Sequence, residues 1–189
     1  MSGCPAAPAL TGTLEWMSDR ACDGMPAIFI DRDGVINEHI AGGYVLRQDE
    51  FRWLPGAIDS LRRLSETGLP LFVVSNQSCV NRGLLERAAL AGIMSAMVAT
   101  LREGGVPCDG WICCPHRPDE GCPCRKPGAA MLERIATVRG VRLDESILIG
   151  DSPSDVEAAH NARARGVLVE RNSPASLEAA VARIRGGAR

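Results

Sequence analysis

The chain has 189 residues, of which 46% are hydrophobic and 23% charged, and its formal net charge is -2. A chain of this length and composition can form one globular domain with a sizeable core and has little room for a second. The near-neutral charge and the 4% aromatic content argue against binding of nucleic acid or an anionic membrane. Residues 1–25 show no signal-peptide pattern, and no stretch is long and apolar enough to span a bilayer. We therefore expect a cytoplasmic monomer whose partner is a small molecule.

Strands and helices are expected to alternate along most of the chain. Residues 1–25 mix Pro, Ala, Gly and Ser with little periodicity, which indicates a flexible N-terminal extension before a domain of residues 26–189. Short apolar runs predict buried strands over 27–30, 69–74, 109–113, 146–149 and 167–169. Helical spacing and glycine stop signals predict helices over 55–67, 84–102, 128–138, 154–165 and 176–185. The alternation predicts a three-layer, Rossmann-like α/β domain with a parallel sheet, in which ligands bind beyond the carboxyl ends of the strands.

Two carboxylates, Asp31 and Asp33, directly follow the first predicted strand of that sheet. Gly34 allows a tight exit, so both side chains can point into one crevice. One carboxylate can attack phosphorus to form an aspartyl-phosphate, while the other can protonate a leaving alkoxide and later accept a proton from water. The alternative for an isolated pair is a polar loop with a surface ion pair.

Further polar residues follow the other predicted strands in a fixed order. Ser75 ends the second strand, where a hydroxyl and nearby N–H groups can hold phosphoryl oxygens, although a helix-capping serine is an alternative. Arg125 and Lys126 precede a helix, so they are either an anion site or a solvated basic pair. Asp151 follows the fourth strand and can join Asp31 as a hard oxygen ligand for Mg²⁺, whereas Asp155 is a supporting or capping residue.

A cysteine-rich loop over residues 114–124 carries a metal-site pattern. Cys114, His116, Cys122 and Cys124 form a closed set of three thiolates and one imidazole, which suits structural Zn²⁺. Coincidence or a redox pair is the alternative. Cys113 is expected to face away from this loop by strand alternation. The isolated cysteines, Cys4, Cys22 and Cys79, are interpreted as free thiols.

The order of aspartate pair, serine, lysine and aspartate resembles the haloacid dehalogenase superfamily of phosphatases over residues 28–170. The resemblance implies that Asp31 is the nucleophile and Asp33 the general acid and base, and that Ser75 and Lys126 hold the phosphoryl group. It also implies that Mg²⁺ binds Asp31, the main-chain carbonyl of Asp33, and Asp151. The zinc loop, which is followed directly by Arg125 and Lys126, is similar to the loop found in the branch of this superfamily that lacks a large cap domain.

Within that branch, Gly43-Tyr44-Val45 and Asn76-Gln77-Ser78 resemble the D-glycero-D-manno-heptose 1,7-bisphosphate 7-phosphatases. The resemblance implies removal of the 7-phosphate in the biosynthesis of nucleotide-activated heptose, on the route to lipopolysaccharide. The residues expected to bind this substrate are Tyr44, Asn76, Gln77, Ser78, Arg82, Arg125 and Lys126. The alternatives are a histidinol-phosphate phosphatase, a polynucleotide phosphatase, which would need a basic stripe, and a catalytically idle zinc-bearing binding module.

Overall fold

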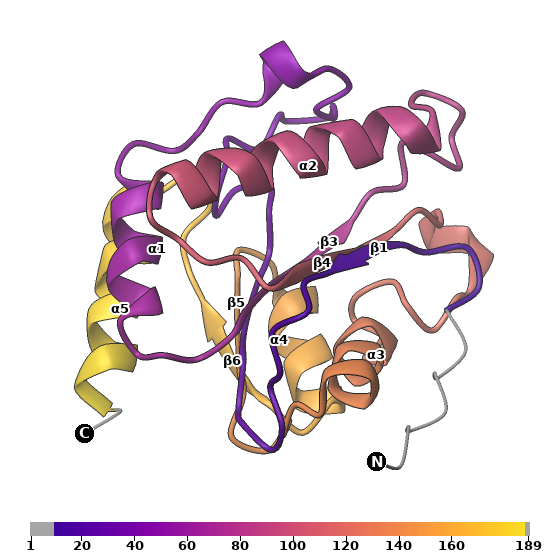
Figure 1. The fold of residues 1–189 in the computed structure, drawn as a ribbon. Coiled ribbons are helices and arrows are strands. Elements are labelled where there is room, and N and C mark those ends of the chain that lie inside the picture. Colours follow the sequence, from indigo (N-terminus) through magenta and orange to yellow (C-terminus); the bar gives the residue numbers. More distant parts are fainter. Residues whose placement is uncertain (1–9, 188–189) are drawn as a thin grey trace.

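A computed structural model describes residues 10–187 of the chain and contains one six-stranded sheet between two layers of helices. The strands lie in the order β1-β4-β3-β2-β5-β6, and all neighbours are parallel except β1 and β4. Figure 1 shows α1, α2 and α5 on one side of the sheet and α3 and α4 on the other. The predicted three-layer α/β architecture is confirmed.

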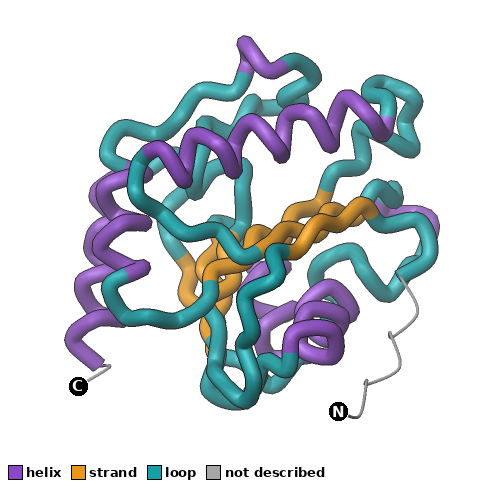
Figure 2. Tube along the Cα trace, in the orientation of Figure 1, coloured by secondary structure: helices purple, strands orange, loops and turns teal. Residues whose placement is uncertain are grey.

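The elements follow the expected alternation, with boundaries shifted by a few residues. The strands are β1 (Leu14–Met17), β2 (Ile28–Ile30), β3 (Leu71–Asn76), β4 (Gly110–Cys114), β5 (Ile147–Gly150) and β6 (Arg165–Leu168). The α-helices are α1 (Ala57–Ser65), α2 (Arg87–Glu103), α3 (Ala130–Arg139), α4 (Pro153–Asn161) and α5 (Pro174–Gly187). Two 3₁₀ turns, η1 (Gln48–Glu50) and η2 (Pro118–Glu120), lie in loops, which Figure 2 distinguishes from the strands.

Side-chain alternation along the strands divides the core into two clusters. Ile28 and Ile30 of β2 pack with the layer of α1, α2 and α5, whereas Phe29 packs with the layer of α3 and α4. In β4, Cys113 belongs to the first cluster and Cys114 to the second. Because neighbouring strand residues point to opposite faces, Cys113 faces away from the cysteine-rich loop as predicted.

The N-terminal segment differs from the sequence prediction. Leu14–Met17 form β1 and pair in antiparallel register with β4, from Leu14 opposite Cys113 to Met17 opposite Gly110. The expected flexible extension over residues 1–25 is therefore wrong for these residues, which add an edge strand. Cys4 lies outside the described residues, while Cys22 and Cys79 are buried free thiols.

The loops at the carboxyl ends of the strands carry no additional domain between residues 10 and 187. The longest connection, between β2 and α1, contains the short turn η1 and isolated bridges that pair Asn37 with Asp33 and with Trp53. No helix in this range is long and apolar enough to cross a membrane. In this range the edge of the sheet at the carboxyl ends of the strands is therefore covered by loops and not by a further domain.

Candidate active site

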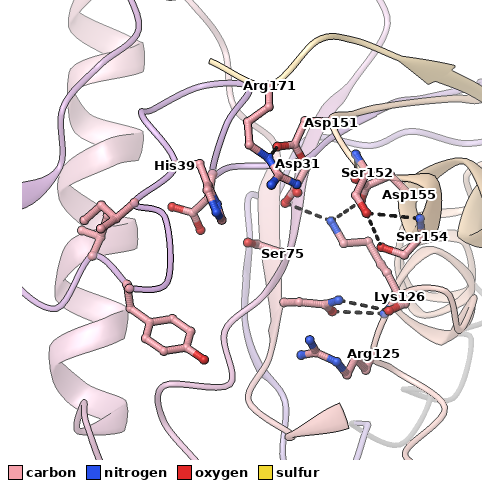
Figure 3. Close-up of a pocket in the computed structure, with 16 residues that line it drawn as sticks. Asp31, His39, Ser75, Arg125, Lys126, Asp151, Ser152, Ser154, Asp155 and Arg171 are labelled. Carbon is pink, nitrogen blue, oxygen red and sulfur yellow. Dashed lines mark hydrogen bonds and ion pairs between the residues drawn. The ribbon is translucent and has the colours of Figure 1, made fainter. Parts of the chain in front are cut away.

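The site is a cavity of about 210 Å³ beyond the carboxyl ends of β2, β3 and β5, as Figure 3 shows. The strand β2 lies between β3 and β5, so its loop occupies the switch point where ligands bind in parallel sheets. The cavity is lined by Asp31, Asp33, His39, Ile40, Gly43, Tyr44, Val45, Ser75, Asn76, Arg125, Lys126, Asp151, Ser152, Ser154, Asp155 and Arg171.

A buried lysine lies between two carboxylates at the base of this cavity. Lys126 Nζ lies 2.9 Å from Asp31 Oδ1 and 2.5 Å from Asp155 Oδ1, and it donates to the carbonyl of Val74 at 2.9 Å. Burial alone lowers the pKa of a lysine, but the charges of Asp31 and Asp155 outweigh it, and the pKa of Lys126 is raised. The ammonium is therefore a fixed positive charge beside Asp31.

The surroundings of Asp31 disfavour the ionised form of its carboxyl group. Burial, together with the carboxylates of Asp155 and Asp33, raises the pKa of Asp31 to about 7, although the charge of Lys126 opposes the shift. The main-chain N–H of Arg32 donates to Asp31 Oδ1 at 2.7 Å and fixes the orientation of the carboxylate. A bound cation would favour the ionised form, which is the form that can act as a nucleophile.

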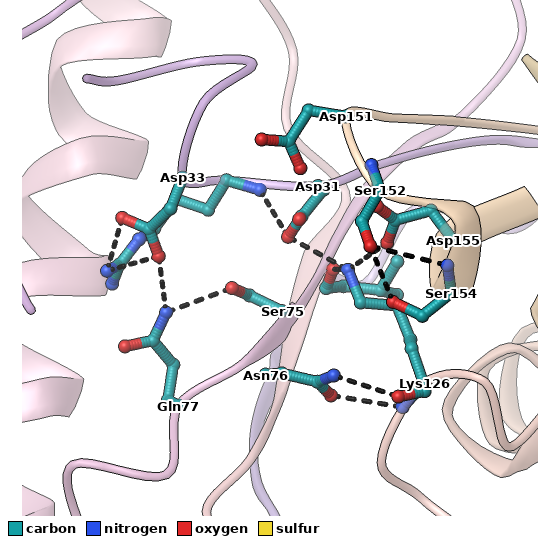
Figure 4. A network of polar contacts seen from close by, with 12 residues as sticks. Asp31, Asp33, Ser75, Asn76, Gln77, Lys126, Asp151, Ser152, Ser154 and Asp155 are labelled. Atoms are coloured by element: carbon teal, nitrogen blue, oxygen red, sulfur yellow. Dashed lines mark hydrogen bonds and ion pairs between the residues drawn. The ribbon is translucent and has the colours of Figure 1, made fainter. Parts of the chain in front are cut away.

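Asp33 accepts hydrogen bonds from a second set of donors, and Figure 4 shows one of them, Gln77, beside it. Arg32 donates to both of its oxygens at 2.9 and 2.8 Å, Asn37 Nδ2 donates to Oδ1 at 2.9 Å, and Gln77 Nε2 donates to Oδ2 at 2.7 Å. Burial raises the pKa of Asp33, but the charge of Arg32 and these hydrogen bonds outweigh burial and lower it. The carboxyl is thus held in its ionised form.

The serine strand and the lysine loop are joined by a pair of hydrogen bonds. Asn76 Oδ1 accepts from the main-chain N–H of Lys126 at 3.0 Å, and Asn76 Nδ2 donates to the carbonyl of Lys126 at 3.1 Å. Ser75, which is 1% exposed, accepts from Gln77 Nε2 at 2.9 Å. These contacts fix Lys126 and Ser75 relative to each other across the cavity.

Three carboxylates at the cavity base could hold a divalent cation. Ligand oxygens of Asp31, Asp151 and Asp155 lie within 4.8 Å of one another. Hard oxygen donors of this kind suit Mg²⁺. Asp155 also accepts a hydrogen bond from the main-chain N–H of Ser152 at 3.0 Å and forms an ion pair with Lys126. Its two oxygens are therefore already bonded to the start of α4 and to the lysine. This leaves Asp31 and Asp151 as the better side-chain ligands.

The cysteine-rich loop brings its four predicted ligands together. The atoms that could bind a metal, Sγ of Cys114, Cys122 and Cys124 and Nδ1 of His116, lie within 4.8 Å of one another. Sulfur–sulfur separations of 3.2 to 3.6 Å exclude disulfides and match thiolates around one ion. The donor set fits tetrahedral zinc.

The structure brings some of the predicted substrate-binding residues to the cavity and not others. Tyr44, Asn76, Arg125 and Lys126 line it. Gln77 and Ser78 are buried behind it, where Gln77 contacts Asp33 and Ser78 bonds the Tyr44 hydroxyl at 3.0 Å. Arg82 is exposed and is not among the lining residues.

Sequence reasoning missed the residues that support the carboxylates. Arg32, the central residue of the Asp31-Arg32-Asp33 run, is 0% exposed, although an arginine in a loop suggests a solvated side chain. Asn37 and Arg171 also contact the site carboxylates. Arg171 lies after the last strand, which ends at the same edge of the sheet. That position was the sequence signal that could have identified Arg171 as a site residue.

Comparisons with known proteins agree with this geometry. A family model described as HAD-hydrolase-like matches residues 123–185, which include Lys126 and Asp151. A crystal structure of D,D-heptose 1,7-bisphosphate phosphatase from B. bronchiseptica, complexed with magnesium and phosphate, matches with a TM-score of 0.79 and 31% identity. The match covers 86% of this chain and 99% of that one. The fold and site thus define a HAD-like phosphatase.

Two curated relatives narrow the assignment. The D-glycero-beta-D-manno-heptose-1,7-bisphosphate 7-phosphatase of Photorhabdus laumondii is 36% identical over 164 residues, which are 82% of this chain and 86% of the relative. The corresponding alpha-anomer enzyme of Mycobacterium tuberculosis is 38% identical over 138 residues, which are 72% and 73% of the two chains. The chain belongs to the D-glycero-D-manno-heptose-1,7-bisphosphate 7-phosphatase family of HAD-like hydrolases.

Proposed function

We propose that the protein is a magnesium-dependent phosphomonoesterase that removes the 7-phosphate of D-glycero-D-manno-heptose 1,7-bisphosphate. The observation that carries the proposal is the buried Asp31 carboxylate, 2.9 Å from Lys126 at the base of a cavity that Ser75 also lines. The family supplies the substrate, since relatives and a solved structure are named for it. The reaction lies in the supply of nucleotide-activated heptose.

The first half of the reaction is attack on phosphorus by Asp31. An oxygen of Asp31 bonds to phosphorus as the bond to the sugar oxygen breaks, which gives an aspartyl-phosphate and an alkoxide. Lys126 and Ser75 both line the cavity and would hold the phosphoryl oxygens. Positioning and charge neutralisation are the main catalytic requirements of this chemistry.

Asp33 supplies the proton transfers of both halves. In its protonated form it donates a proton to the departing alkoxide, and in its ionised form it accepts one from the water that attacks the aspartyl-phosphate. The contacts with Arg32, Asn37 and Gln77 stabilise the ionised form. These contacts support the proposed role of Asp33 as the base in the second half of the reaction.

Magnesium would be held by Asp31, Asp151 and the main-chain carbonyl of Asp33, and when bound it supplies positive charge to the transferring phosphoryl group. Zinc would be held by Cys114, His116, Cys122 and Cys124. With four protein ligands the zinc site has no open position, so its role is to stabilise the loop that leads into Arg125 and Lys126.

The second phosphate of the substrate needs a positive charge away from Lys126. Arg125 lines the cavity, and Figure 3 places it on the side opposite Arg171, with Ser75 between them. One guanidinium nitrogen of Arg125 donates to the carbonyl of His116 at 3.1 Å, which leaves further N–H donors for a phosphate. Tyr44, whose hydroxyl is hydrogen-bonded to Ser78, would form part of the cavity wall that contacts the sugar.

We also propose that the protein acts as a cytoplasmic monomer on the free sugar bisphosphate. The near-neutral charge of the chain supports a small-molecule partner over nucleic acid. Sedimentation of the purified protein at several concentrations tests the monomer. A concentration-dependent shift to a dimer would contradict it.

Phosphate release tests the proposed activity. Purified protein with Mg²⁺ is expected to release one phosphate from heptose 1,7-bisphosphate and to leave the 1-phosphate intact, as observed by ³¹P NMR. Asp31→Asn should abolish turnover, whereas the exposed Asp19→Asn should not. Release of the 1-phosphate, or an active Asp31→Asn protein, would contradict the proposal.

A further inference from the structure

Arg171 forms an ion pair with Asp151 that the mechanism above does not use. Its Nε donates to Asp151 Oδ2 at 2.5 Å. The Asp151 side chain is 4% exposed, whereas that of Arg171 is 49% exposed. Figure 3 shows the guanidinium lying over the Asp151 carboxylate at the edge of the cavity. A half-exposed cation therefore covers a nearly buried carboxylate.

The loop that carries Arg171 is fixed on both sides. The main-chain N–H of Asn172 donates to the carbonyl of Gly34 at 2.9 Å, and Asn172 Oδ1 accepts from the N–H of His39 at 2.7 Å. Gly34 leaves room for the pair, because a Cβ atom there would lie 2.2 Å from Asp151 Oδ2 and 3.1 Å from Arg171 Cγ. The ion pair thus depends on two loops that are joined to each other.

The charges at the cavity base explain why such a cation is useful. Asp31, Asp151 and Asp155 place carboxylate oxygens within 4.8 Å of one another. Lys126 pairs with Asp31 and Asp155, and Arg171 pairs with Asp151. Each of the three carboxylates therefore has a cationic partner within the protein, which reduces their mutual repulsion.

From this arrangement we infer that Arg171 is an internal counter-ion that competes with Mg²⁺ for Asp151 and thereby sets the magnesium affinity. The inference rests on the magnesium site proposed above. A divalent cation on Asp151 and the guanidinium on its Oδ2 repel each other, so binding of the metal must weaken or displace the ion pair. Because Arg171 is half-exposed, its side chain can move into solvent without disturbing the core.

Linkage gives this competition two measurable consequences. Loss of the Arg171 charge should tighten magnesium binding by at least about fivefold, the low end of the coupling between linked sites. The same loss should destabilise the metal-free protein, since Asp151 then lacks its partner among crowded carboxylates. Added Mg²⁺ should restore this stability through binding to the folded state.

Isothermal titration of metal-free protein with Mg²⁺ tests the inference without any turnover. Arg171→Gln should show the lower Kd and a lower metal-free Tm than wild type. Arg165→Gln, an exposed position at the start of β6, removes the same formal charge away from the cavity and should leave both values unchanged. Arg171→Lys should stay closer to wild type than Arg171→Gln.

An unchanged or weaker magnesium affinity in Arg171→Gln would overturn the inference, as would an equal gain in Arg165→Gln. A wild-type protein that binds no Mg²⁺ would also overturn it. These results are separate from a failure of the proposed function, which would appear as absence of heptose bisphosphate turnover by wild-type protein with measured Mg²⁺ binding.

Discussion

The side-chain amide of Gln77 donates to Asp33 Oδ2 at 2.7 Å and so ties the second carboxylate of the site to the strand that carries Ser75. The same nitrogen donates to Ser75 Oγ at 2.9 Å. Gln77 is 1% exposed, so water does not replace these bonds. One buried amide thus holds both Asp33, the proposed proton-transfer group, and Ser75, the proposed phosphoryl-binding group.

Asp33→Asn tests the proton-transfer role. We expect a loss of about 10²–10⁴-fold in kcat with an alkyl phosphate, because a poor leaving group needs a proton in the transition state. The leaving group of an aryl phosphate needs less protonation, so the loss of kcat with an aryl phosphate should be at most about a tenth as large. Steady-state rates on both substrates provide the measurement. Equal losses on the two would argue against an acid role for Asp33.

Gln77→Met tests the positioning of Asp33 separately. The change keeps the size of the side chain but removes the donor that Asp33 and Ser75 share. We expect kcat for the alkyl phosphate to fall by about tenfold, the effect of one lost hydrogen bond to a charged group. Circular dichroism and Tm report whether the fold is kept. A variant with wild-type kcat would show that Gln77 has no positioning role.

Removal of one zinc ligand should destabilise the loop over residues 114–124. Elemental analysis should find about one zinc per wild-type chain, as four-ligand sites bind one ion. Cys122→Ser should lose the metal, lower Tm and raise KM, because Arg125 and Lys126 follow directly in the chain. Cys22→Ala, which removes a buried thiol outside the cluster, is the control and should retain zinc. Purified wild-type protein without zinc, together with a Cys122→Ser variant that keeps the wild-type Tm, would contradict a stabilising role.

Arg125→Ala and Arg82→Ala distinguish a cavity arginine from an exposed one. Loss of Arg125 should lower kcat/KM for the bisphosphate by about 10- to 100-fold, the effect of a lost charged hydrogen bond, and should affect a simple monophosphate less. Arg82→Ala should lie near wild type, because Arg82 does not line the cavity. The opposite ranking of the two variants on the bisphosphate would place the second phosphate beside Arg82.

Because the thiol of Cys108 is buried, we expect the free energy of unfolding to fall in alkaline solution. Burial raises the pKa of Cys108 from 9.0 to about 12. The folded protein therefore keeps this proton at a pH where the unfolded chain has lost it. The stability that the thiol contributes is complete below pH 9.0 and declines as the pH rises toward about 12, by up to about 1.4 kcal/mol per unit.

Urea unfolding of wild type and Cys108→Ala at about pH 8 and about pH 10 measures this effect. The difference in free energy of unfolding between the two proteins should narrow by about 1 kcal/mol at the higher pH. Comparison with Cys108→Ala cancels the titration of other groups, since they are common to both. A difference that stays constant or widens would contradict the raised pKa of Cys108.

The sequence predicted the parts of the fold that repeat a local pattern. The run at Ile28 to Ile30 and the residues Ser75 and Asp151 at strand ends lie where alternation of strands and helices places them. Leu14–Met17 were missed because a short edge strand with one buried residue lacks a periodic signal. Its pairing with β4 is a contact between distant segments.

The site was predictable to the extent that its residues follow strands directly. Asp31 and Lys126 lie together as expected because sheet topology brings strand ends together. The zinc ligands form a separate cluster, which was predictable because they are close in sequence. The partners of Asp33 and Asp151 could not be derived in this way. Arg32 turns into the core and Arg171 comes from a separate loop, and both orientations depend on tertiary packing.

The most direct test of the account is a comparison of kcat/KM for heptose 1,7-bisphosphate and histidinol phosphate with one preparation of the protein and Mg²⁺. We predict that the bisphosphate is preferred by at least about 100-fold, equal to about 2.7 kcal/mol of transition-state discrimination. Arg125 lines the cavity, and in the proposed role its charge would attract the second phosphate and repel the amine of histidinol phosphate. A preference for histidinol phosphate, or equal values for the two substrates, would contradict the proposed function.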